Sequence, residues 1–109
     1  MIPFAVLLTN AAVRDLDKLY DFIAEHDTPR KANFVLKQIE KAFTKLSEFP
    51  ERGTYPKELL AIGIREYREV FFKPYRIIYR VMDKKVYVLL IVDGRRDMQS
   101  LLQRRLLDA

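Results

Sequence analysis

The sequence contains no cysteine, one histidine and only three glycines in 109 residues. The absence of cysteine excludes a disulfide scaffold, a cysteine nucleophile and any thiolate metal site. His26, the single histidine, excludes histidine-rich metal clusters, and its place at the end of a predicted helix favours an interaction with the helix carbonyls. The glycines, at 53, 63 and 94, lack the spacing of a phosphate-binding or dinucleotide-binding loop. We therefore expect no metal and no cofactor.

Long apolar runs are also absent. No stretch approaches the roughly 18 apolar residues that a membrane-spanning helix needs. The first 15 residues contain no basic segment and only a short apolar run, so they do not resemble a signal peptide. These observations predict a cytoplasmic protein with no membrane partner.

The composition is that of an ordinary globular protein, with 50% hydrophobic and 32% charged residues. A chain of this length has room for one domain, and neither a repeat nor a linker divides it, so we expect a single domain over residues 1–109. The formal net charge is +5, and arginines are concentrated after residue 64. Such a balance favours an anionic partner, either nucleic acid or an acidic protein segment, although ordinary solubilising charge gives the same count.

The first half of the chain predicts a strand and two helices. Residues 2–8 form a short apolar run that is typical of a strand. Apolar residues then recur at helical spacing between positions 12 and 23, after Thr9 or Asn10 as a possible cap. A second amphipathic segment begins at Pro29 and ends before Pro50. Because the connection between them is short, the two helices should form a hairpin.

The second half predicts strands. Residues 49–63 are irregular, and three runs rich in Val, Ile, Tyr and Phe follow at 64–72, 75–82 and 85–92. Short turns between them indicate an antiparallel meander, and the unbroken apolar character of the last run indicates a central strand covered on both faces. Asp97 can cap a final helix. The order β-α-α-β-β-β-α predicts an α+β fold, in which an N-terminal helical hairpin and a C-terminal helix accompany an antiparallel sheet.

Arginines are the main candidates for function. Six of them lie on the predicted meander or in the loop after it: Arg65, Arg68, Arg76, Arg80, Arg95 and Arg96. Guanidinium groups suit phosphate and carboxylate oxygens, and neighbouring strands bring such positions within side-chain reach. A structural role is favoured for Arg65, Arg68 and Arg80. These three would form surface ion pairs with Glu66, Glu69 and Asp83. The others are stronger functional candidates because loops beside a rigid sheet often carry function.

The apolar stripe of the final helix has two interpretations. Leu101, Leu102 and Leu106 either belong to the core or form a docking face for a partner, as amphipathic segments at a chain end can do. The core interpretation is the more common one for such a stripe, and both stay open at the level of sequence.

Several motifs in this sequence resemble the signature of the ParE/RelE toxins. They are PYRIIYRV at 74–81 and VYVLLIVDGRRD at 86–97, preceded by A-x-x-D-L at 12–16, F-P-x-x-G at 49–53 and I-G-I-R at 62–65. Together the motifs cover nearly the whole chain in the family's order. The resemblance implies the family's fold and a growth-inhibiting toxin. It also implies a cognate antitoxin that holds the toxin inactive in a hetero-oligomer and wraps its surface with an extended, helix-containing tail.

Two activities occur in the family that the sequence resembles. RelE-like members cleave messenger RNA in the ribosomal decoding site, whereas ParE-like members poison DNA gyrase. For RNA cleavage, Arg76 and Arg96 match the family's arginines, and Glu69 could act as a base. However, Tyr67 and Glu69 stand where a RelE-type alignment places lysines, and no Tyr or His follows Tyr87 to act as an acid.

The resemblance therefore favours a ParE-like toxin that inhibits DNA gyrase by binding and is not itself an enzyme. The target contacts would be Arg76, Arg95, Arg96, Arg65 and Arg68, and the antitoxin contacts would be Leu101, Leu102 and Leu106. The first alternative is a RelE-like, ribosome-dependent mRNA endonuclease. The second is a basic nucleic-acid-binding module without toxicity.

Overall fold

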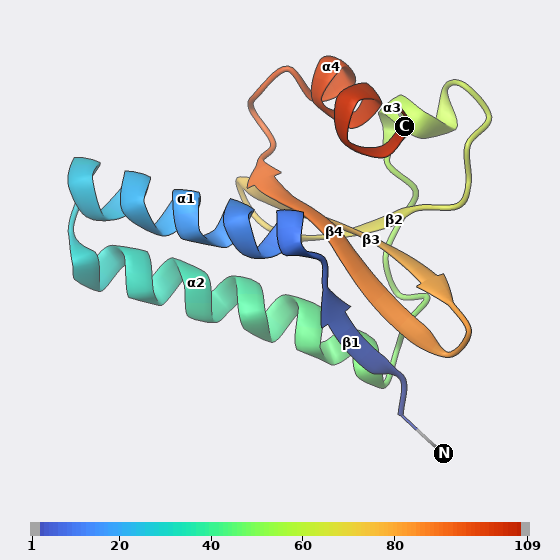
Figure 1. Cartoon of the computed structure of the whole chain (residues 1–109), viewed down its shortest axis with the longest axis horizontal. Helices are drawn as coiled ribbons and strands as arrows, with labels where there is room; N and C mark the ends of the chain where they lie inside the picture. The colour runs from blue at the N-terminus through green and yellow to red at the C-terminus, as the bar shows by residue number, and fades with distance from the viewer. Residues whose placement is uncertain (1–2, 108–109) are drawn as a thin grey trace.

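A computed structural model describes residues 3–107 of the chain, which form one sheet with helices on both of its faces (Figure 1). The strands are β1 (Ala5–Leu8), β2 (Arg68–Phe72), β3 (Tyr75–Met82) and β4 (Lys85–Asp93). The helices are α1 (Asn10–His26), α2 (Pro29–Thr44), α3 (Lys57–Leu60) and α4 (Met98–Leu102), with a 3-10 turn at Lys45–Ser47 and a π-helical turn at Gln103–Leu107. Within this part of the chain, every helix is too short or too polar to span a bilayer.

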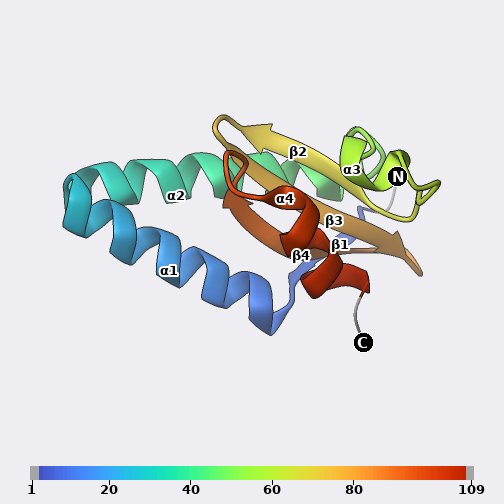
Figure 2. The same cartoon turned by 90° about the horizontal axis from the view of Figure 1, so that it is seen from above.

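The helices form two layers around the sheet. Helices α1 and α2 form the predicted hairpin and pack on one face, where they share a core with β1, β3 and β4. Seen from above, α4 lies over β3 and β4 on the other face, where a second core joins it to α3 (Figure 2). The sheet is therefore covered on both sides.

Local signals fix the helix ends as the sequence predicts. The N-cap side chains of Thr9 and Asp97 accept hydrogen bonds from backbone N–H groups in the first turn of α1 and α4, at 3.1 and 3.2 Å. Thr28 does the same for α2 at 3.0 Å. At the other end of α1, His26 Nδ1 lies 2.9 Å from the carbonyl oxygen of Phe22, and the two rings stack. The predicted interaction of His26 with its helix is confirmed.

The strand order is β1-β4-β3-β2, and β2, β3 and β4 form the predicted antiparallel meander. Strand β1 pairs parallel with β4, from Ala5 opposite Lys85 to Leu8 opposite Val88, so the sheet is mixed rather than wholly antiparallel. A parallel neighbour needs a long crossover connection, which the helical hairpin and the meander supply. The α+β class is as predicted, and so is the order of elements apart from the short helix α3 before β2.

The segment before β2 differs from the prediction. Residues 64–67 do not belong to the strand, which begins at Arg68, and the segment predicted as irregular contains the short helix α3. Ile64 and Tyr67 instead pack into the core between α3, α4 and the sheet. The apolar character of this run therefore reflects core packing outside the ladder, which a strand pattern cannot distinguish.

Strand β4 lies between β1 and β3 and is buried on both faces, as its sequence predicts. A β-bulge interrupts its pairing, because Ile78 pairs with Leu90 while Tyr79 pairs with Val88, which leaves Leu89 as an extra residue. The bulge changes which positions face the helical hairpin, so the strand contributes side chains to that core both before and after it: Val86, Val88 and Ile91. The lack of alternation in the sequence follows from the bulge and the double coverage together.

Strand β4 extends beyond the last residue that pairs with β1. There, side chains form hydrogen bonds with the backbone groups of β4 that have no strand partner. The N–H of Ile91 donates to Asp15 Oδ2 at 3.0 Å, and Arg105 Nη2 donates to the carbonyl oxygen of Leu89 at 3.0 Å. Asp15 and Arg105 also bind each other through two hydrogen bonds of 2.9 Å. Asp15 is the acidic residue of the A-x-x-D-L motif, so this motif fixes α1 and the C-terminal turn to the sheet.

This arrangement predicts a large effect of Asp15→Ala. The substitution leaves the N–H of Ile91 and the guanidinium of Arg105 without their acceptor, so the free energy of unfolding should fall by about 2 to 3 kcal/mol. Urea unfolding followed by circular dichroism measures this change. Asp17→Ala, at an exposed position of the same helix, is the control and should cost less than about 0.5 kcal/mol. Equal losses in the two variants would contradict the assigned role of Asp15.

Candidate functional site

A buried arginine joins two glutamates between α3 and the sheet. Arg76, on β3, is 7% exposed. Its Nε donates to Glu69 Oε1 on β2 at 2.7 Å, and its two terminal nitrogens donate to the two carboxylate oxygens of Glu58 on α3, each at 2.8 Å. The planar fork of the guanidinium matches the Glu58 carboxylate in this geometry. The Glu58–Arg76–Glu69 cluster therefore fixes α3 to the meander.

The pKa values of the two glutamates shift in opposite directions. Hydrogen bonds from Arg76 lower the pKa of Glu58 below its ordinary value, against a smaller opposing effect of burial. Burial raises the pKa of Glu69 above its ordinary value, although the hydrogen bond from Arg76 acts against the rise. The carboxylate of Glu58 and then that of Glu69 raise the pKa of Arg76, which keeps its charge.

The cluster changes the interpretation of two predicted site residues. The sequence predicts Arg76 as a target contact or as a stabiliser of phosphate charge, but in the structure its donors face the carboxylates of Glu69, which is buried, and Glu58, which is half-buried. Glu69, the predicted base of the RNase alternative, is 5% exposed and bound to Arg76. Neither side chain is open to a partner in this conformation. Glu58, whose side chain completes the cluster, lies in none of the sequence motifs.

Two of the three motif glycines, Gly53 and Gly94, make close backbone approaches to side chains of β3. A Cβ atom on Gly94, in GRRD, would lie 2.6 Å from Cδ of Arg76. A Cβ atom on Gly53, in F-P-x-x-G, would lie 2.6 Å from the hydroxyl of Tyr79, which accepts a hydrogen bond from the Gly53 N–H at 3.0 Å. Only glycine fits such contacts without a shift of the neighbouring atoms. These two motif glycines therefore have a structural explanation.

Arg95 and Arg96 lie in the loop after β4 and are exposed. Arg95 binds the Asp93 carboxylate, with Nη2 2.6 Å from Oδ2, and this contact lowers the pKa of Asp93. The two arginines border a groove of about 390 Å³ between α1 and the end of β4, which has apolar side chains among its lining residues: Leu19, Phe22, Ile91 and Val92. An apolar groove with a cationic rim suits a partner that carries both apolar and acidic groups.

The predicted surface ion pairs of Arg65, Arg68 and Arg80 are wrong. Arg68 Nη1 donates to the carbonyl oxygen of Gly53 at 2.9 Å, and its guanidinium lies over the ring of Tyr55. The guanidinium of Arg80 lies over a tyrosine ring, and the ion pairs found in residues 3–107 involve none of these three arginines. The prediction fails because β2 begins only at Arg68, which leaves residues 65 and 66 in a loop, and because the proposed partner of Arg68 faces Arg76.

The leucine stripe of the last helix belongs to the core. Leu101 and Leu102 are 4% and 1% exposed and pack against the sheet and α3, and Leu106 packs beside them. The core interpretation is correct for this structure, so the stripe offers no free face to an antitoxin here.

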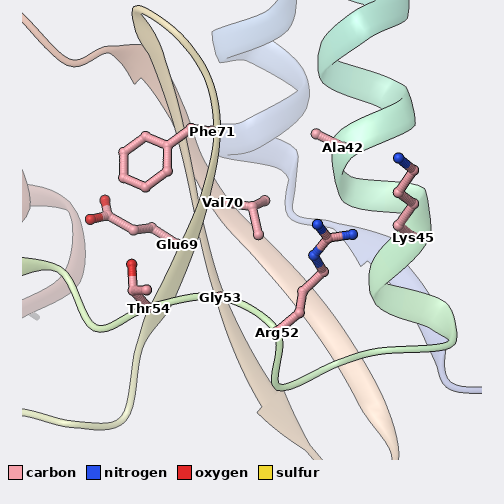
Figure 3. Close-up of a pocket in the computed structure, with 8 residues that line it drawn as sticks. All are labelled: Ala42, Lys45, Arg52, Gly53, Thr54, Glu69, Val70 and Phe71. Carbon is pink, nitrogen blue, oxygen red and sulfur yellow. The ribbon is translucent and has the colours of Figure 1, made fainter.

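A hollow of about 340 Å³ lies beside β2, at the outer edge of the sheet (Figure 3). Ala42 and Lys45 line it from α2 and the turn that follows, Arg52 lines it from the loop after that turn, and Val70 points into it from β2. Sequence patterns do not point to Lys45 and Arg52, because the two residues lie in different segments and Arg52 occupies a variable position of the F-P-x-x-G motif. Within the described residues, no group of three histidine or acidic side chains is placed to hold a metal ion.

Comparisons with known proteins agree with the fold and the motifs. Residues 6–98 match the family described as the ParE toxin of the type II toxin–antitoxin system parDE. Toxin ParE3 from Caulobacter vibrioides is 30% identical to this chain over 100 residues, which cover 92% of this chain and 96% of that protein.

Solved structures of toxins are similar as well. A chain of the chromosomal ParDE system of P. aeruginosa superposes with a TM-score of 0.71 at 21% identity, over 85% of this chain and 98% of that one. A chain of the RelBE2 toxin–antitoxin complex of Mycobacterium tuberculosis gives a TM-score of 0.56 at 29% identity, over 85% and 93%. A mutant of the E. coli toxin RelE in the free state gives 0.59 at 18% identity, over 95% and 99%.

The Glu58–Arg76–Glu69 cluster predicts a strong stability effect of Arg76→Met. The substitution removes the cation and leaves the buried carboxylate of Glu69 and the half-buried carboxylate of Glu58 without a partner, so the free energy of unfolding should fall by about 3 to 5 kcal/mol. Urea unfolding at neutral pH measures the loss. Arg80→Met, on the same strand but with no ion pair among residues 3–107, is the matched control and should cost about 1 kcal/mol or less. A cost for Arg76→Met no larger than the control's would contradict the structural role.

The raised pKa of Glu69 predicts a pH-dependent effect of Glu69→Gln. Because the folded-state pKa lies above the unfolded value of about 4.3, ionisation of Glu69 disfavours the fold as the pH rises through and beyond that value. Glutamine cannot ionise, so the stability of the variant relative to the wild type should increase between about pH 4 and about pH 7. Glu66→Gln, at an exposed position, serves as the control. A relative stability that stays constant, or falls, over this range would show that burial does not control Glu69.

Proposed function

The chain belongs to the ParE family of toxins from type II toxin–antitoxin systems, and we propose that it arrests growth by binding DNA gyrase while a cognate antitoxin holds it inactive. The observation that carries the choice of gyrase is the Glu58–Arg76–Glu69 cluster. The arginine that an RNA-cleaving relative would direct at phosphate is held here by the buried carboxylate of Glu69 and the half-buried carboxylate of Glu58.

Most of the positions that an RNase of this fold would need are occupied by buried residues. RNA cleavage through the 2′-hydroxyl requires a base, an acid and cations around the phosphate. Arg76 and Glu69 are bound to each other, and Tyr67, at a position where lysine would be expected, is 8% exposed. Leu102, near the position of the expected tyrosine, is buried. Of the residues that resemble the catalytic set, Arg96 alone is exposed, which supports action by binding.

The groove beside Arg95 and Arg96 is the proposed contact with the target. Its apolar lining can bury side chains of a protein partner, and the cationic rim can bind carboxylate or phosphate oxygens. Arg65 and Arg68 line a third, smaller hollow of about 260 Å³ and are proposed as additional contacts. An antitoxin partner is supported by the ParDE and RelBE2 systems whose toxins resemble this chain.

Two assays on the purified chain separate gyrase inhibition from RNA cleavage, which the 29% identity to the RelBE2 chain keeps as the alternative. We expect inhibition of gyrase-catalysed supercoiling with accumulation of cleaved DNA, and no codon-specific cuts in mRNA on translating ribosomes. Full supercoiling activity together with ribosome-dependent cuts would overturn the proposal in favour of a RelE-like endonuclease. Expression in cells should arrest growth, and an adjacent antitoxin gene should restore it.

The double variant Arg95→Gln/Arg96→Gln tests the proposed contact. Because both side chains are exposed, the free energy of unfolding should change by less than about 0.5 kcal/mol, whereas gyrase inhibition should weaken about tenfold or more. Arg30→Gln/Lys37→Gln removes the same charge from exposed positions of α2 and should inhibit like the wild type. Full inhibition by the loop variant would show that these arginines do not contact the target.

A further inference from the structure

The groove between α1 and the end of β4, called here the α1–β4 groove, carries positive charge from two elements. Lys18 lines it from α1, and Arg95 and Arg96 line it from the loop after β4. Its volume of about 390 Å³ lies in the range of pockets that hold small organic groups. The proposed function assigns this groove to the target, and its lining also indicates which kind of chemical group it accepts.

The acidic side chains that line the groove are already paired. Both carboxylate oxygens of Asp15 accept hydrogen bonds from an arginine of the C-terminal turn, and the carboxylate of Asp93 binds Arg95. The ion pairs described in residues 3–107 include neither Lys18 nor Arg96. The groove therefore keeps two positive charges, one from α1 and one from the loop, for an anionic ligand.

Two aromatic rings line the same groove, and each is supported by another ring. Phe22, on α1, is 59% exposed, and its ring stacks on that of His26 with the ring centroids 4.1 Å apart and an angle of 20° between the ring planes. Tyr75 lines the groove from β3, and its ring stacks on that of Phe72 at 6.5 Å and 14°. An exposed ring that is supported on one face is a platform on which a planar ligand can stack.

The spacing of Lys18 and Phe22 matches a ligand with one planar ring and one anionic group. The two residues are four positions apart on α1, so their side chains lie on the same face of the helix, about one turn of 5.4 Å apart along its axis. In a nucleotide, one sugar joins a planar base to an anionic phosphate over a comparable separation. An acidic peptide would need two side chains to supply the same pair of groups, so the spacing favours a nucleotide.

We propose that the α1–β4 groove binds one unpaired nucleotide of single-stranded DNA. The base stacks on the ring of Phe22, and the phosphate binds Lys18 and Arg96. The nucleotide is unpaired because neighbouring bases cover both faces of a base inside a duplex. The inference deepens the proposed function, on which the choice of DNA rests: gyrase holds DNA, and a strand end at a cut in DNA is a place where a nucleotide can leave the stack.

Nuclear magnetic resonance on the purified chain tests the base contact without any substitution. The probe is a single-stranded DNA oligonucleotide of about eight nucleotides. Stacking of a base should shift the ring protons of Phe22 upfield, whereas those of Phe34, an exposed phenylalanine of α2 outside the groove, should not move. An unshifted Phe22 ring at about 1 mM oligonucleotide would overturn the inference. Tighter binding of an RNA oligonucleotide of matching sequence would overturn the choice of DNA.

Substitutions at position 22 separate stacking from general apolar contact. Phe22→Leu keeps an apolar side chain but removes the ring, so the affinity for the oligonucleotide should fall about tenfold, whereas Phe22→Trp keeps a ring and should bind at least as tightly as the wild type. Phe34→Leu is the matched control and should bind like the wild type. Equal affinities of the two leucine variants would overturn the stacking contact. If Phe22→Leu fails to fold, the shift of the Phe22 ring in the wild type still decides the question.

The phosphate contact has its own test in the salt dependence of binding. In Lys18→Gln/Arg96→Gln, the slope of log affinity against log salt concentration should become shallower by about 0.7 for each phosphate contact that is lost. Arg30→Gln/Lys37→Gln removes the same charge from exposed positions of α2 and should leave the slope unchanged. Equal slopes of the two double variants would overturn the assigned contact. An acidic peptide with a phenylalanine that binds more tightly than the oligonucleotide, and depends on Phe22, would assign the groove to a protein segment and overturn the inference.

Gyrase assays distinguish the failure of this inference from the failure of the proposed function. Phe22→Leu should inhibit gyrase about tenfold more weakly than the wild type, whereas Phe34→Leu should inhibit equally. A chain that inhibits gyrase but does not bind the oligonucleotide overturns the inference alone. A chain that binds the oligonucleotide through Phe22 and Lys18 but leaves gyrase fully active overturns the proposed function alone.

Discussion

The position of Arg76 connects parts of the fold that are distant in sequence. Its guanidinium lies between a strand neighbour, Glu69, and a helix residue, Glu58, and Gly94 packs on its aliphatic stem. A buried cation is stable only if it is paired, because the loss of hydration must be offset by nearby negative charge. The two carboxylates meet this requirement by holding α3 against the meander. The exit turn of β4 is constrained by the same side chain, since only glycine leaves room for it.

Some features of this fold can be predicted from the sequence, whereas the contacts of the same cluster cannot. Periodicity and capping residues predict the helical hairpin, the meander and the buried central strand, because these features depend on neighbours close in the chain. The burial of Arg76 depends on Glu58, which is 18 residues away, and the closed edge of β4 depends on Asp15 and Arg105, which are 90 residues apart. Pairs of residues so far apart in the chain produce no periodic pattern in the sequence. The sequence therefore predicts a surface contact for Arg76, whereas in the structure its side chain supports the fold from inside.

The exposed charges divide the surface into separate regions. Arg95 and Arg96 flank the groove beside α1, while Lys45 and Arg52 flank the outer edge of β2. Neither region uses the motif residues that the buried cluster immobilises. In a family whose members share a scaffold and differ in their targets, this separation lets the framework stay constant while the outer cations change with the partner.

The bulge at Leu89 has a consequence for how this fold can diverge. One additional residue in β4 turns Ile91 toward the helical hairpin, and the loop with Arg95 leaves the strand in the direction set by that turn. A deletion there would exchange the two faces of everything that follows, moving core side chains to the wrong layer and the cationic loop away from α1. Lineages can therefore replace side chains along this strand far more freely than they can gain or lose a single position in it.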